Sequence, residues 1–201
     1  MFRHTATRFE QEVVTIHPGE YYATTEDTIV ATVLGSCIAV GLFDPAGKAG
    51  GLNHFMLPAP LGSSDFPVSQ SAKYGMYAME LLMNDLMKLG VQRKDVRAKV
   101  FGGGAVLKMG DSARPRIAEG NIDFAFEYLK KEGIPLVASD VGGVEPRKIF
   151  FYTRGGKVLL KRIGGTLVNL VQKDEERYLQ DIQQRKQEGP IVLFADPPRR
   201  S

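Results

Sequence analysis

The sequence has one cysteine and no tryptophan among its 201 residues. A single cysteine excludes a disulfide within the chain and the multi-cysteine ligand sets of structural zinc sites. The three histidines, His4, His17 and His54, show no HxxxH spacing, so we expect neither a metal site nor a cofactor. Cys37 therefore has two interpretations, an inert buried side chain or a nucleophile.

Long apolar runs are also missing. The longest ones, such as residues 38–43, are far too short to span a membrane, and residues 1–12 carry charges but no apolar signal core. We therefore expect a cytoplasmic protein with no direct membrane insertion. The formal net charge is only +3, and basic and acidic residues are mixed along the chain. Without a basic stripe and interleaved aromatic residues, binding to nucleic acid has little support.

What the sequence does contain is an alternation of β-rich blocks with two long helical patterns. Apolar residues at spacings of three and four predict helices over residues 74–89 and 117–132, each followed by glycine. Strands are expected over residues 30–43 (interrupted at Gly35-Ser36), 50–57, 98–101, 135–139, 148–153 and 157–162. Residues 1–18 are polar and irregular, and residues 174–187 predict a highly charged, exposed helix. The pattern favours an α+β sandwich of mixed, mainly antiparallel sheets over a doubly wound parallel sheet.

The candidate chemistry lies in the first β-rich block. Cys37 and His54 stand on adjacent strand-like segments joined by the turn residues 44–47, and two antiparallel strands can bring them to one face. A thiol attacks an amide carbonyl as the thiolate, and a neighbouring imidazole can accept its proton and later protonate the departing ammonia. This is the logic of Cys–His acyl transfer.

The residues just before Cys37 add a second element. Gly35 permits a tight bend and leaves room for a substrate, and backbone N–H groups at such a bend can form an oxyanion hole. Ser36 fits either a donor to that hole or a residue that stabilises the turn, and the hydroxyl of Thr32 can orient His54. Further candidates for a third group, which turn chemistry explains equally well, are Asp44, Asp140 and Glu145.

Several segments of the sequence resemble a known family. The stretch TVLGSCIAV at 32–40, followed by Asp44-Pro45 and by GGLNHFMLP at 50–58, closely resembles the signature of the CheD family of chemoreceptor glutamine deamidases. Further segments that fit the same family lie at 73–90, 98–107, 121–143 and 156–163. The resemblance covers about residues 14–165 in order.

The resemblance implies an enzyme that hydrolyses the carboxamide of particular glutamines in methyl-accepting chemotaxis receptors to glutamate and releases ammonia. It implies Cys37 as the nucleophile and His54 as the base, with an upstream threonine as the third residue. In some members that threonine stands six residues before the cysteine, where this chain has Ala31, whereas the threonine here is Thr32. A one-residue shift on a strand reverses the direction of the side chain, so the third role stays open.

The implied fold is a layered α/β/β sandwich with two main helices, similar to the catalytic domain of cytotoxic necrotizing factor toxins. We expect a flexible segment at 1–13, a deamidase domain at 14–165 and a charged C-terminal extension at 166–201. Because the receptor glutamines of this family lie on exposed helices, the resemblance implies an open, shallow site. The loop at 61–71 is expected to line it.

Two kinds of partner follow from the resemblance. The receptors are the protein substrate, and a CheC-type phosphatase is a candidate partner because some family members bind one. Two alternatives stay open, a binding module that regulates such a phosphatase and a general cysteine hydrolase of small amides or peptides.

Overall fold

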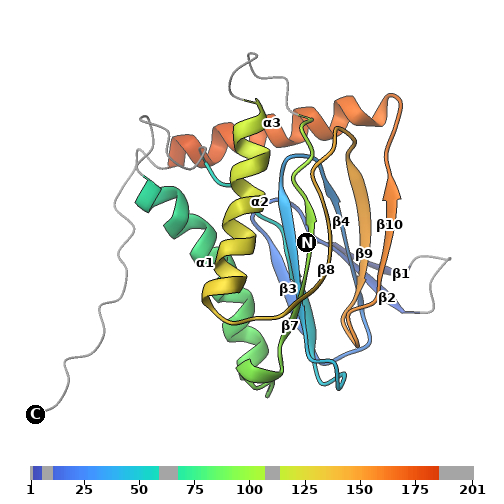
Figure 1. Ribbon diagram of the computed structural model, residues 1–201. Coiled ribbons are helices and arrows are strands. Elements are labelled where there is room, and N and C mark those ends of the chain that lie inside the picture. The colour runs from blue at the N-terminus through green and yellow to red at the C-terminus, as the bar shows by residue number, and fades with distance from the viewer. Residues whose placement is uncertain (1, 6–10, 59–67, 107–113, 186–201) are drawn as a thin grey trace, which may run out of the picture.

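The computed structural model describes residues 2–5, 11–58, 68–106 and 114–185 (Figure 1). Its strands are β1 (Phe2–Thr5), β2 (Glu12–Thr15), β3 (Tyr21–Thr24), β4 (Ile29–Leu34), β5 (Ile38–Phe43), β6 (Gly50–Asn53), β7 (Arg97–Gly102), β8 (Leu136–Val141), β9 (Arg147–Tyr152) and β10 (Val158–Arg162). Its helices are α1 (Val68–Lys88), α2 (Arg114–Lys131) and α3 (Leu167–Arg185), with a short 3-10 turn at Arg93–Asp95. Within these ranges, none of the helices combines the length and the apolar character that a membrane span requires.

The strands form two five-stranded sheets, which we call sheet A and sheet B. Sheet A has the order β1-β2-β4-β9-β10, and sheet B has the order β3-β6-β5-β7-β8. All strand pairs are antiparallel except β2 with β4 and β7 with β8. Helices α1 and α2 lie side by side along one face of the sandwich, and α3 crosses one end of it (Figure 1). The predicted α+β sandwich of mixed, mainly antiparallel sheets is confirmed.

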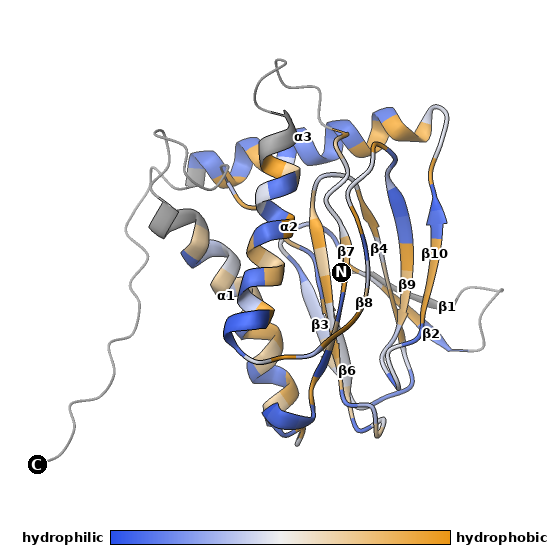
Figure 2. Cartoon of the chain, viewed as in Figure 1, coloured by the Kyte–Doolittle hydropathy of each residue, from blue (hydrophilic) through white to orange (hydrophobic). Residues whose placement is uncertain are grey.

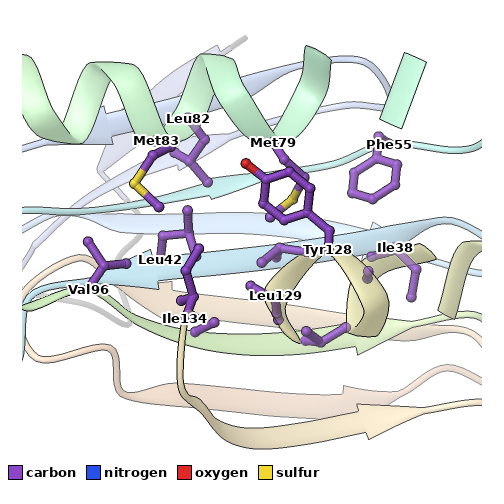
Figure 3. Close-up of a cluster of buried hydrophobic side chains, with 14 of the residues drawn as sticks. Ile38, Leu42, Phe55, Met79, Leu82, Met83, Val96, Tyr128, Leu129 and Ile134 are labelled. Atoms are coloured by element: carbon purple, nitrogen blue, oxygen red, sulfur yellow. The ribbon is translucent and has the colours of Figure 1, made fainter. Parts of the chain in front are cut away.

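The side chains of β5 divide between two buried clusters because successive residues of a strand point to opposite faces. Ile38, Val40 and Leu42 belong to the cluster under α1 and α2. Figure 3 shows the side chains of Ile38 and Leu42 among residues of both helices. Cys37, Ala39 and Phe43 belong instead to the cluster between the two sheets. Burial of the apolar strand thus directs Cys37 into the space between the sheets.

Two parts of the chain differ from the expectations drawn from the sequence. Phe2–Thr5 and Glu12–Thr15, expected to be irregular, pair as the antiparallel strands β1 and β2. The charged C-terminal helix begins earlier than expected, at Leu167, and Figure 2 shows hydrophobic and hydrophilic residues alternating along it. The side chains of Glu175, Leu179 and Ile182 on this helix are buried, so it packs on the sandwich instead of lying in solvent.

The loop expected at 61–71 is only partly described. Residues 61–67 lie outside the described residues, and residues 68–71 belong to the first turn of α1. The helix therefore begins well before residue 74, where the sequence pattern placed it.

Candidate active site

Cys37 and His54 meet at the ends of two paired strands of sheet B. Cys37 immediately precedes β5 and His54 immediately follows β6, and these strands are antiparallel neighbours. Beyond the end of β6, Ile38 and Phe55 exchange two backbone hydrogen bonds of 2.9 Å, which extends the pairing past His54 to the residue next to Cys37. A side-chain donor atom of Cys37 and one of His54 lie within 4.8 Å of each other. The predicted hairpin thus brings the thiol and the imidazole together.

Thr32 reaches this pair from the opposite sheet. Its Oγ1 lies 2.7 Å from Nδ1 of His54 and also donates a 2.9 Å hydrogen bond to the carbonyl oxygen of Ile16. A threonine hydroxyl has one proton. Because that proton goes to the carbonyl, the contact with His54 must be Nδ1–H donating to Oγ1.

This tautomer leaves Nε2 of His54 without a proton. Nε2 is buried and has no hydrogen-bond partner in the described part of the chain. A ring nitrogen of His54 and the sulfur of Cys37 lie within 4.8 Å of each other, so a thiol and an imidazole with one deprotonated nitrogen share this site, as general-base catalysis requires. Ala31, the residue before Thr32, faces the other way and packs with Val13 and Ile29. Thr32 is therefore the residue whose hydroxyl contacts the imidazole.

The turn at Gly35-Ser36 links β4 of sheet A to β5 of sheet B. Hydrogen bonds to its backbone carbonyl groups hold it in place. The carbonyl of Gly35 accepts a 2.6 Å hydrogen bond from the N–H of Gly104, and the carbonyl of Cys37 accepts a 2.8 Å bond from that of Gly103. Nδ2 of Asn121 on α2 donates to the carbonyl of Ser36 at 2.8 Å. With the turn's carbonyls occupied by these donors, its N–H groups remain to bind an anion.

A carboxylate that the sequence did not predict occupies those N–H groups. Glu175 of α3 accepts hydrogen bonds at Oε1 from the N–H of Gly35 (2.9 Å) and of Cys37 (3.1 Å). At Oε2 it accepts 2.7 Å bonds from both the N–H and the hydroxyl of Ser36. One of its oxygens lies within 4.8 Å of donor atoms of both Cys37 and His54. Ser36 is therefore a donor at the turn, toward Glu175.

The electrostatics of this arrangement keep both reacting groups uncharged. Burial raises the pKa of the Cys37 thiol well above its usual range, and the negative charge of Glu175 and a hydrogen bond to it raise it further. Burial also lowers the pKa of His54 to about 3, with a smaller effect from the charge of His17. At neutral pH the arrangement with Glu175 in place therefore holds a thiol and a neutral imidazole.

Comparison with known proteins gives the chain a family. A family model described as CheD chemotactic sensory transduction matches residues 56–162. A protein of Herminiimonas arsenicoxydans named "Probable chemoreceptor glutamine deamidase CheD" is 44% identical over 93% of this chain and 91% of its own length. A protein of Shewanella oneidensis named "Probable chemoreceptor glutamine deamidase CheD 1" is 41% identical over 96% of this chain and 93% of its own length. This chain belongs to the CheD family.

Membership of the CheD family confirms the resemblance that the sequence motifs indicated. Among solved structures, a crystal structure of a Neisseria meningitidis protein is similar over 61% of this chain and 53% of that chain, with a TM-score of 0.40 and 14% identity.

The site of this CheD-family chain is closed, whereas the sequence led us to expect an open, shallow one. Cys37 has none of its surface exposed, and His54 is 1% exposed. Helix α3 contributes to the closure, because it brings Glu175 onto the nucleophile turn and buries Leu179 and Ile182 in the cluster that contains Cys37. Beside the site, a surface hollow is lined by His54, Gly19, Tyr21, Tyr74 and Tyr77 among others.

Two further candidates for a third group, Asp44 and Asp140, have structural roles. Asp44 lies at the end of β5 far from Cys37, where its Oδ1 accepts a 2.8 Å hydrogen bond from the N–H of Ala46 in the turn. Asp140 forms ion pairs with Arg147 and Arg162, at 2.7 and 2.8 Å. Turn chemistry and ion pairing account for both aspartates.

Cys37, His54 and Glu175 are also residue types that bind metals, and their donor atoms lie within 4.8 Å of one another. The carboxylate oxygens of Glu175 already accept four hydrogen bonds from the nucleophile turn. Hydrogen bonding therefore accounts for the position of the carboxylate without a metal ion.

Proposed function

We propose that this chain hydrolyses glutamine side chains of chemotaxis receptors to glutamate, with Cys37 as nucleophile and His54 as base. Its relatives are named probable chemoreceptor glutamine deamidases, which supports the substrate. The observation that carries the chemistry is the hydrogen bond from His54 to Thr32, because it leaves Nε2 unprotonated on an imidazole that has a ring nitrogen within 4.8 Å of the only thiol of the chain.

The reaction begins when Nε2 of His54 takes the proton of Cys37. The thiolate attacks the carboxamide carbon of the glutamine, and the N–H groups of Gly35 and Cys37 stabilise the oxygen that becomes negative. The imidazolium then protonates the leaving ammonia, and a thioester remains on Cys37. Water, activated by the same imidazole, releases glutamate and restores the thiol.

Thr32 is a positioning residue in this mechanism. Its hydroxyl contacts His54 but not the substrate, and it fixes both the tautomer and the orientation of the ring. Ser36 both belongs to the turn and donates to the anion that the turn binds, because its N–H and its hydroxyl each donate a hydrogen bond to that anion.

The cytoplasmic location and a CheC-type phosphatase partner stay predictions from the family resemblance. So does the alternative in which the chain is mainly a binding module that regulates such a phosphatase.

The direct test is mass spectrometry of a receptor fragment incubated with the wild type and with Cys37→Ala. We expect the wild type to release ammonia and to raise the mass of target glutamines by about one dalton, the exchange of an amide for a carboxylate. Cys37→Ala should leave the fragment unchanged. Conversion by Cys37→Ala at the wild-type rate would refute the nucleophile, and cleavage of the peptide backbone would indicate a general cysteine hydrolase.

A further inference from the structure

The side chain that fills the nucleophile turn is chemically the product of the proposed reaction. Deamidation converts a glutamine side chain into a glutamate side chain, and Glu175 is a glutamate presented by a helix. Its Oε1 lies on the N–H groups of Gly35 and Cys37, the donors expected to bind the oxygen of the reacting amide. A product bound at the end of a turnover would make these same contacts.

Helix α3, which carries Glu175, contacts the rest of the protein along much of its length. Leu179 and Ile182, four and seven residues after Glu175, are buried in the cluster between the sheets. At one end of the helix Gln172 donates a 2.6 Å hydrogen bond to the carbonyl of Val106. At the other end Gln183 donates a 2.8 Å bond to the carbonyl of Pro58.

A further contact joins α3 to the hollow beside His54. The hydroxyl of Tyr178 is hydrogen-bonded to that of Tyr74, one of the residues that line the hollow. Tyr178 also covers Gly19, where an added Cβ would lie 2.7 Å from its hydroxyl oxygen. Helix α3 thus places Glu175 on the anion-binding turn and Tyr178 against the hollow beside His54.

We propose that α3 is an internal product mimic that occupies the substrate site, so that the enzyme works only when α3 moves away. The proposal rests on the proposed function, since it takes the nucleophile turn to be the place where the amide reacts. The proposal also predicts which residue pattern a substrate helix should carry. A receptor helix that replaces α3 would present its glutamine at the place of Glu175, with apolar residues four and seven positions later.

The charge on Glu175 makes this occupancy inhibitory in two ways. The carboxylate fills the donors that a substrate oxygen needs, and it disfavours a thiolate beside it. When α3 leaves, the like charge goes and water can reach Cys37 and His54. Both changes favour the charged pair that reacts.

The sharpest test replaces the mimic by a substrate. In the variant Glu175→Gln the amide lies beside Cys37, and the chain should deamidate itself. The thiolate of Cys37 attacks the Cδ of residue 175, ammonia leaves with the proton held by His54, and water cleaves the thioester to glutamate. Peptide mass spectrometry should therefore find glutamate at position 175 in Glu175→Gln, and glutamine in the double variant Glu175→Gln with Cys37→Ala.

A matched control lies next to this residue. In the variant Glu176→Gln the new amide stands on the same helix one position away, and among the described residues no hydrogen bond joins that position to the nucleophile turn, so it should stay glutamine. Conversion at 176 as fast as at 175 would contradict the proposal, because it would show unselective deamidation. A glutamine that persists at 175, while the same preparation converts a receptor fragment, would refute the product mimic and leave the proposed function standing.

A second measurement does not depend on turnover. Alkylation of Cys37 by iodoacetamide near neutral pH should be faster in Glu175→Ala than in the wild type by about tenfold or more, because the loss of several charge-assisted hydrogen bonds favours the open state. Glu176→Ala should alkylate at the wild-type rate. If neither residue 175 nor the receptor fragment is converted in the first test, the proposed function fails. The alkylation rate of Glu175→Ala relative to the wild type then shows by itself whether α3 closes the site. Equal rates in Glu175→Ala and the wild type would overturn it.

Discussion

At the scale of single residues, the hydroxyl of Thr32 decides which nitrogen of His54 carries the proton. Because Oγ1 gives its own proton to the carbonyl of Ile16, it can only accept from Nδ1, and Nε2 is left as the base. A residue that acts only through hydrogen bonding can be tested by variants that keep its shape or keep its hydroxyl.

Thr32→Val keeps the shape of the side chain and removes the hydroxyl. We expect kcat for receptor deamidation to fall by about tenfold to a hundredfold with little change in KM, since the substrate does not contact this residue. Thr32→Ser should restore most of the rate because it keeps the hydroxyl. A loss of the same size in both variants would show that packing, and not the hydrogen bond, accounts for the effect.

The buried imidazole predicts how stability depends on pH. The pKa of His54 is lowered from 6.5 to about 3 by burial, so the folded chain resists protonation that the unfolded chain accepts. The contribution of the neutral His54 to the free energy of unfolding is fully present above pH 6.5, and it is lost as the pH falls from 6.5 toward 3. Between pH 7 and pH 5 this one group should lower the free energy of unfolding by about 2 kcal/mol.

Urea titrations at the two pH values measure this effect. His54→Gln cannot take up the proton, so its free energy of unfolding should fall less between pH 7 and pH 5 than that of the wild type. If the wild type and His54→Gln lose the same stability over this range, the imidazole is not held neutral by the fold.

At the scale of elements, the nucleophile turn depends on the two glycines at the end of β7, Gly102 in the strand and Gly103 just after it. Gly102 has a φ of 115° and Gly103 a φ of 64°, and a Cβ on Gly102 would collide with the carbonyl oxygen of Cys37. The turn can therefore approach β7 closely only because these positions lack side chains.

Gly102→Ala should lower the free energy of unfolding by about 2 to 4 kcal/mol, because backbone strain and the collision add together. Gly142→Ala is the matched control. Its φ of 76° imposes similar strain, but an added Cβ would meet no atom within 4 Å, so it should cost about 1 kcal/mol. Thermal or urea unfolding of the two variants gives the comparison, and equal losses would show that the close approach to Cys37 does not matter.

The elements around the site were predictable where their signals were local. The apolar periodicity before Gly90 and Gly133 predicted α1 and α2, and the turn at 44–47 predicted the hairpin that joins Cys37 to His54. The sequence made Thr32 a candidate partner of His54 but could not fix the contact, because it depends on how two sheets stack. Glu175 was missed because a buried carboxylate and a solvated one look the same within a charged helical segment.

At the scale of the whole molecule, sheets A and B are tied together at the end where the site lies. Arg147 begins β9 of sheet A, is completely buried, and pairs with Asp140 on β8 of sheet B at 2.7 Å. It also donates hydrogen bonds to the carbonyls of Gly142 and Glu145. The pairing of distant strands that brings these residues together had no signal in the local sequence pattern.

Arg147→Ala should lower the free energy of unfolding by about 2 to 4 kcal/mol, since it removes a buried side chain and leaves the carbonyls of Gly142 and Glu145 and one oxygen of Asp140 without their donor. Arg162 also pairs with Asp140, but its side chain is 45% exposed, and Arg162→Ala should cost less than about 1 kcal/mol. Chemical denaturation measures both losses. Similar values for the two arginines would contradict the role assigned to the buried one.

Catalysis by Cys37 requires a covalent bond between its sulfur and the receptor glutamine during each turnover. The most direct measurement is intact mass spectrometry of wild-type enzyme that has been quenched with acid during turnover of a receptor fragment. We expect an adduct on Cys37 whose mass is the sum of enzyme and fragment less one ammonia, and we expect no such adduct in Cys37→Ala. Deamidation that proceeds in Cys37→Ala at the wild-type rate, with no adduct in either protein, would contradict catalysis by Cys37.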